Sequence, residues 1–187
     1  VFFFLEEKFF KSKIEKIFRN KSSKVIFQKI NDQIYNYFQI KIFTSLITGL
    51  LTFIILFFSS NDLSIFFGIL AFILNFIPFI GSLISIILPF LFSLIQDIDF
   101  FSSMTILIFL FLIQMLIGNF FEPKLMGKSL NLSPMIMLVT LSIMGKIWGI
   151  SGMFLSVPLL VILLIIFSNI KSTKKIAIFL SEKGNIN

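Results

Sequence analysis

The chain has no cysteine and no histidine among its 187 residues. The first absence excludes disulfide bonds and thiolate metal ligands, and the second excludes imidazole ligands and the Ser-His and Cys-His pairs of most hydrolytic enzymes. No Gly-rich phosphate-binding loop with its Lys is present either, so ATP is not an expected energy source. We therefore expect no metal, no cofactor and no enzymatic activity.

Charge is scarce in the middle of the chain. Only seven charged residues lie between Ile42 and Ile170, while 57% of all residues are hydrophobic and the mean hydropathy is +1.04. Helices of about 20 apolar residues match a hydrocarbon core roughly 30 Å thick. The sequence therefore predicts an all-α fold, a polytopic transmembrane helical bundle with Gly- and Pro-broken or re-entrant helices.

The net charge of +7 is concentrated at the two ends of the chain. These cations lie beside apolar spans and form no groove with interleaved aromatic residues, which favours anionic lipid headgroups over nucleic acid as the partner. Because Lys and Arg concentrate on cytoplasmic loops, we expect both ends inside the cell and an even number of crossings.

Three segments follow from these patterns. Residues 1–39 hold eight Lys or Arg and four Asp or Glu in an amphipathic helical pattern. They are either a basic arm on the inner leaflet or, as we favour, the end of a soluble helical domain. Residues 40–170 are the transmembrane domain, with four to six crossings, and residues 171–187 are a basic cytoplasmic tail.

The first span, at 42–59, carries small polar residues about one turn apart. These are Thr44, Ser45, Thr48 and Gly49. Small residues at this spacing let two helices approach closely, so we expect them to form a helix–helix contact face.

Two later apolar stretches, 63–95 and 132–169, are each too long for one span and are interrupted by Gly and Pro. The first is either a pair of short crossings, giving six in all, or a re-entrant hairpin, giving four. A broken helix is tolerated in a bilayer only where protein or a water-filled cavity surrounds it, and a pair of breaks points to a transporter's substrate site. The alternative is that these prolines only kink or end helices. The break residues are Asn75, Pro78, Gly81, Gly149, Gly152 and Pro158.

Glu122 follows a span predicted over 100–118, at the start of a loop predicted over 119–131. Pro123 is expected to restrict its backbone to extended geometry. We expect Glu122 to relay a proton or hold a cation at an inner vestibule. The alternative is a surface acid paired with Lys124 or Lys128. The candidate pathway residues in and beside this loop are Asn119, Glu122, Pro123, Gly127 and Pro134.

Three stretches carry a family resemblance, NFIPFIG at 75–81, GNFFEPKLMGKSLNLSP at 118–134 and WGISGMFLSVP at 148–158. From about residue 30 to residue 167 the chain resembles the autoinducer-2 exporter-like (AI-2E) family of bacterial membrane proteins. The resemblance implies that this is the C-terminal portion of a polytopic inner-membrane protein, with residues 1–39 ending a soluble insertion. It also implies transport of a signalling molecule, a cation or another solute.

We accordingly expect a multi-pass secondary transporter of the bacterial inner membrane that exports a small polar solute such as autoinducer-2, with a role in quorum sensing. One alternative is a Na⁺(K⁺)/H⁺ antiporter, and another is a non-transporting membrane scaffold or assembly protein. The expected partners are membrane lipids and a small solute or monovalent cation, with a homo-oligomer allowed.

Overall fold

A computed structural model describes residues 21–96, 98–126, 131–182 and 184. These residues form helices and no strand beyond one isolated bridge, which confirms the all-α fold. The elements are α2 (Lys21–Phe58), α3 (Ser64–Leu74), α4 (Ile80–Ile95), α5 (Phe100–Leu116), the π-helix η1 (Ile117–Phe121), α6 (Glu122–Met126), α7 (Pro134–Asn169), the 3-10 helix η3 (Lys171–Thr173) and α8 (Lys174–Leu180).

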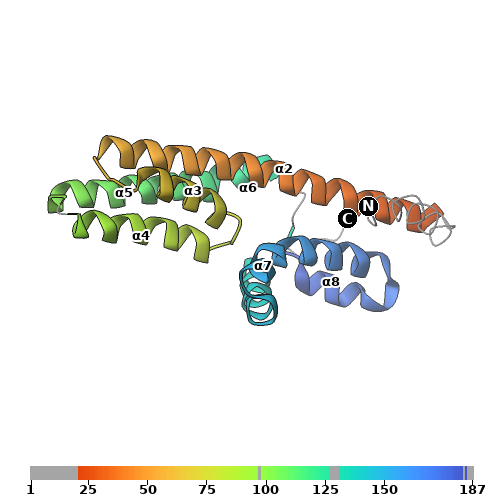
Figure 1. Cartoon of the computed structure of the whole chain (residues 1–187). Helices are drawn as coiled ribbons and strands as arrows, with labels where there is room; N and C mark the ends of the chain where they lie inside the picture. Colours follow the sequence, from red (N-terminus) through yellow and green to blue (C-terminus); the bar gives the residue numbers. More distant parts are fainter. Residues whose placement is uncertain (1–20, 97, 127–130, 183, 185–187) are drawn as a thin grey trace, which may run out of the picture.

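Helix α2 runs along most of the molecule (Figure 1). It is continuous through residue 39, so the described end of the expected N-terminal segment and the first expected span form one helix. Residues 1–20 of that segment lie outside the described residues. The second half of α2 packs beside α3 and α5, and its first half lies beside the second arm of α7.

The predicted contact face on α2 is confirmed. Thr44, Ser45 and Thr48 are fully buried, and the face packs mainly against α3. At the closest approach, a Cβ added to Gly49 would lie 2.7 Å from the backbone oxygen of Gly68, and one added to Gly68 would lie 3.0 Å from that of Gly49. Only glycine at both positions allows the two backbones to come this close.

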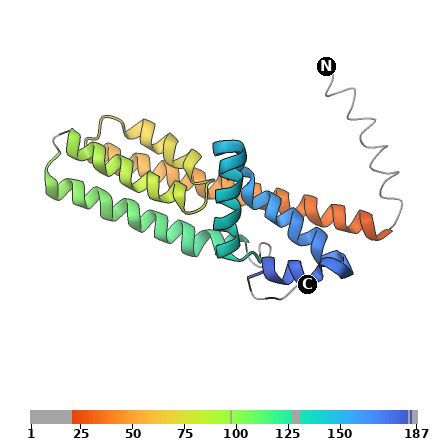
Figure 2. The ribbon, with the colours of Figure 1, turned by 90° about the horizontal axis from the view of Figure 1, so that it is seen from below.

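Helices α3 and α4 form a hairpin whose two outer ends lie at the same end of the bundle (Figure 2). The Gln96 side chain joins those ends, because its amide nitrogen donates to the Ser60 carbonyl and its oxygen accepts from the Asp62 N–H, both at 3.1 Å. The 11 residues of α3 rise only about 16 Å, about half of a hydrocarbon core. The 16 residues of α4 rise about 24 Å.

The loop predicted over 119–131 is wrong in its first half. Residues 117–121 form a π-helix and Glu122–Met126 continues as α6, so helical structure extends from Phe100 to Met126. Glu122 is helical, with φ −61° and ψ −50°, and not extended as expected before a proline. Its N–H donates to the Ile117 carbonyl five residues back. This wider turn admits Pro123, whose ring would crowd an ordinary α-helical turn.

Helix α7 bends sharply at Gly149, where φ is 63° and ψ is −144°. Its first arm crosses the bundle and its second runs beside the first half of α2 (Figure 2). The predicted break in the last apolar stretch is therefore confirmed. After α8 the chain returns to the segment before α7, where Ser181 forms an antiparallel bridge with Leu132.

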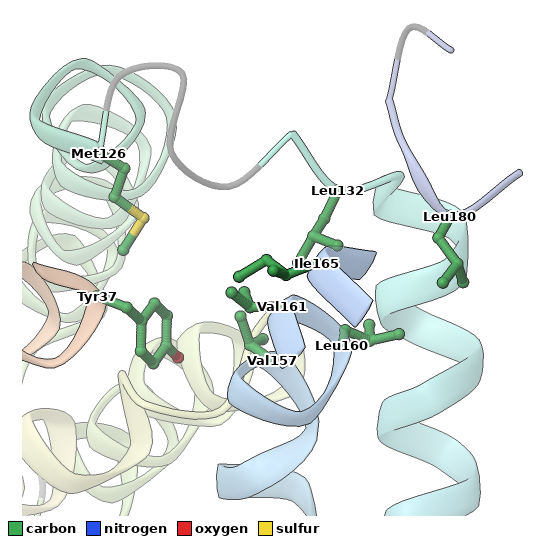
Figure 3. Close-up of a cluster of buried hydrophobic side chains, with 8 residues drawn as sticks. All are labelled: Tyr37, Met126, Leu132, Val157, Leu160, Val161, Ile165 and Leu180. Atoms are coloured by element: carbon green, nitrogen blue, oxygen red, sulfur yellow. The ribbon is translucent and has the colours of Figure 1, made fainter. Parts of the chain in front are cut away.

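Three helical stretches are long and apolar enough to cross a membrane, and they are Lys24–Phe58, Phe100–Met126 and Pro134–Asn169. They support a multi-pass membrane protein. One core cluster joins α2 and α6 to the segment before α7, α7 and α8 (Figure 3). Its buried members are Tyr37, Met126, Leu132, Val157, Leu160, Val161, Ile165 and Leu180.

Candidate functional site

The first helix break is the tip of the α3–α4 hairpin. Phe79 adopts a positive φ of 62°, and the Ile80 N–H donates to the Pro78 carbonyl at 2.7 Å, which makes a strained γ-turn. A Cβ added to Gly81 would overlap the carbonyl oxygen of Leu74. Gly81 therefore allows the start of α4 to press on the end of α3.

The second break has the same construction. Gly149 carries the positive φ, and a Cβ added to Gly152 would overlap the carbonyl oxygen of Met144. Aromatic rings join the two breaks, because Phe76 of the hairpin tip stacks on Phe154 with centroids 4.7 Å apart and an interplanar angle of 25°. The structure thus brings the two interrupted segments together.

The polar side chain at the hairpin tip is held by α2. Asn75 is buried, and its amide nitrogen donates to the Ser45 hydroxyl at 2.9 Å. This buried hydrogen bond joins residues 30 positions apart and fixes the hairpin tip against the middle of α2.

An ion pair lies close to this tip. Lys41 of α2 donates from Nζ to Oε1 of Glu122 at 2.5 Å, and the two side chains are only 6% and 15% exposed. Glu122 therefore has a partner on another helix, and the expected alternative of a solvated loop acid with Lys124 or Lys128 as its partner does not describe it. Lys128 itself lies outside the described residues.

A cavity of about 780 Å³ surrounds the ion pair and the hairpin tip. Its walls come from α2, the start of α4, α5, η1, α6, α7 and the segments that flank α7 and α8. Most lining residues are apolar. The polar ones are Tyr37, Lys41, Asn75, Ser82, Gln114, Asn119, Glu122, Asn131 and Glu182.

The predicted pathway residues divide between this cavity and its supports. Asn75, Pro78, Asn119, Glu122 and Pro123 line the cavity. The others lie outside its lining, with Gly81 supporting the hairpin, Gly149, Gly152 and Pro158 shaping α7, and Pro134 starting that helix. Gly127 lies outside the described residues.

Sequence reasoning missed Lys41, Tyr37 and Gln114. Lys41 directly precedes the first expected span, where a lysine would ordinarily reach the water interface, yet it is only 5% exposed. A usable signal existed, because Lys41 begins the same buried stripe of α2 as Thr44, Ser45 and Thr48, and a charge on a buried face requires a partner.

The described residues contain no cluster of three or more His, Cys, Asp or Glu able to hold a metal ion. Apart from the Lys41–Glu122 ion pair and the exposed Glu182, the polar lining consists of hydroxyl and amide groups. Such groups hydrogen-bond to an uncharged polar molecule, whereas apolar walls fix its shape.

Comparison with known proteins agrees with the resemblance seen in the sequence. The profile described as AI-2E family transporter matches residues 1–172. A protein of Borreliella burgdorferi provisionally named as a transport protein is 41% identical over 155 residues, which cover 81% of this chain and 42% of the relative. The AI-2 transport protein TqsA of Escherichia coli is 34% identical over 155 residues, which cover 83% of this chain and 45% of the relative. The chain spans less than half the length of these curated relatives.

Proposed function

Because the chain belongs to the AI-2E family of transporters, we propose that it contributes the solute pathway of a secondary transporter that exports a small polar solute such as autoinducer-2. The observation that supports this is the cavity at the hairpin tip, where amide and hydroxyl groups of several helices converge. The transporter resides in the bacterial inner membrane as a multi-pass protein and serves quorum sensing.

The two helix breaks support a pathway at this position. Irregular backbone at membrane depth is tolerated where it lines a cavity, and Pro78 and Phe79 of the first break do line it. Transporters commonly place substrate at discontinuous helices. The stacking of Phe76 on Phe154 connects the second break to the same place.

The arrangement of the helices favours a specific topology. The second half of α2 and the stretch Phe100–Met126 cross the membrane in opposite directions, and the α3–α4 hairpin enters and leaves from the outer side. The turns that hold Asp62 and Asp99 then face outward. The Lys-rich first half of α2 then faces the cytoplasm, in agreement with the positive-inside rule.

The ion pair favours an uncharged cargo over Na⁺/H⁺ antiport. A transported cation needs a free carboxylate or a cluster of backbone carbonyls. Glu122 is instead neutralised by the Lys41 ammonium at hydrogen-bond distance. Apart from the exposed Glu182, the remaining polar lining residues are neutral and suit a molecule rich in hydroxyl groups.

The test measures uptake of labelled autoinducer-2 into everted membrane vesicles that contain the full-length protein. Gln114→Leu and Asn119→Leu remove polar groups from the cavity wall, and both are expected to reduce uptake severalfold at equal membrane levels. Thr105→Val is the matched control, because its hydroxyl is exposed and donates to the Phe101 carbonyl of its own helix. Equal uptake by all four proteins would contradict the assignment of the cavity. No uptake by any of them, wild type included, would favour the scaffold function.

A further inference from the structure

Lys41 is a buried cation in the wall of the cavity. It lies on α2, 81 positions before Glu122, and its Nζ contacts the Glu122 carboxylate directly. Removal of an ammonium group from water costs several kcal/mol unless a partner compensates it. The burial of Lys41 is therefore stable only with Glu122 beside it.

The surroundings of Glu122 are suited to a small cation. Na⁺ and K⁺ are coordinated by oxygen atoms, and Tyr37, Gln114 and Asn119, whose side chains each carry an oxygen, line the same cavity as Glu122. The Lys41 ammonium carries the same charge as those ions and already occupies the carboxylate. Glu182 also lines the cavity, but its side chain is exposed.

We infer that Lys41 is a specificity-determining residue. Its ammonium group occupies the Glu122 carboxylate, so Na⁺ and K⁺ do not bind there and the cavity accepts uncharged polar solutes. The inference rests on the proposed function, since it assigns the cavity to solute. Replacement of Lys41 by a neutral residue leaves an unpaired carboxylate in a cavity that is also lined by neutral, oxygen-bearing side chains. That variant gains a site for a monovalent cation.

The experiment measures thermal unfolding of the purified full-length protein in NaCl and in N-methylglucamine chloride at equal ionic strength. A ligand that binds only the folded state raises the unfolding temperature. The unfolding temperatures of Lys41→Gln and Lys41→Met are each expected to be at least about 3 °C higher in NaCl than in N-methylglucamine chloride. Both variants are also expected to bind radioactive Na⁺. Lys41→Met serves as the second variant because its unbranched side chain fills similar space without a polar group.

The controls separate charge from structure. Lys41→Arg keeps the cation, so neither it nor the wild type is expected to respond to Na⁺. The double variant with Lys41→Gln and Glu122→Gln has no carboxylate and is expected to lose the response. If Lys41 had only a structural role, the single variants would be less stable than the wild type to the same extent with and without Na⁺.

Three outcomes would overturn the inference. They are a Na⁺ response of the wild type equal to that of Lys41→Gln, folded single variants without a response, and single variants that fail to fold even in NaCl. Uptake of autoinducer-2 is measured in parallel. A wild type without uptake beside a Lys41→Gln protein that binds Na⁺ refutes the proposed function alone, whereas uptake without Na⁺ binding by that variant refutes the role of Lys41 alone.

Discussion

Substitution of Gly81 by alanine is predicted to open the hairpin tip. The added Cβ would overlap the Leu74 carbonyl oxygen and lie 2.7 Å from the Leu74 carbonyl carbon. Carbon atoms pack best at about 3.5–4.0 Å, so the end of α3 and the start of α4 must part by about 1 Å. Both atoms in the clash belong to the backbone, and no side-chain rotation relieves it.

The loss in the free energy of unfolding has two sources, overpacking at the tip and a broken hydrogen bond. Overpacking costs about 1–3 kcal/mol. The Asn75–Ser45 hydrogen bond, now 2.9 Å, is buried and is lost when the tip moves by 1 Å, which adds about 1–3 kcal/mol. The better helix propensity of alanine offsets about 1 kcal/mol of this loss. A net loss of about 3 kcal/mol is expected, together with reduced uptake of autoinducer-2.

Gly118→Ala provides the matched comparison, because nothing lies within 4 Å of a Cβ at that position. It is expected to leave the free energy of unfolding unchanged or to raise it by up to about 1 kcal/mol. The assay is reversible unfolding of the full-length protein in mixed micelles with increasing denaturing detergent. Equal stability of Gly81→Ala and Gly118→Ala would refute the reasoning, because it would mean that α3 and α4 do not approach as closely as described.

Three further substitutions test other contacts. Ser45→Ala leaves the buried Asn75 amide without its partner and is expected to cost about 1–3 kcal/mol in the same unfolding assay, whereas Ser142→Ala, at an exposed hydroxyl, is expected to cost little. Phe79→Gly relieves the positive φ of the γ-turn and is expected to stabilise the protein by about 0.5–1 kcal/mol, and a loss of stability would argue against that turn. Hydrogen bonds from the side chain and then the N–H of Ser102 hold the pKa of Asp99 below its ordinary value of 3.8. The contribution of Asp99 to the stability of the folded protein is therefore complete above about pH 4 and is lost as the pH falls through the lowered pKa. Asp99→Asn is expected to remove that part of the pH dependence of unfolding.

The helix breaks were predictable because their causes are local. Gly149 and the turn around Pro78 and Phe79 interrupt apolar stretches that are too long for one span, and the structure breaks the chain at those places. The small residues of α2 were predictable for the same reason, since close helix packing depends on side-chain size at regular spacing.

The surroundings of Glu122 were not predictable by the same means. The rule that a residue before proline is extended is a local tendency, and here a π-helical turn overrides it. The partner of Glu122 lies 81 positions earlier in the sequence. Composition around Glu122 points to the nearer lysines, and only the packing of α6 on α2 selects Lys41.

The buried hydroxyl groups have a consequence for how such sequences diverge. Thr48, Ser85 and Ser156 donate to carbonyls of Thr44, Gly81 and Met153 in their own helices. Their hydrogen bonds therefore add nothing between helices, and what the neighbouring helices require is small volume. We therefore expect these positions to accept alanine in related sequences, whereas a larger residue at Gly49 or Gly68 demands a compensating change on the facing helix.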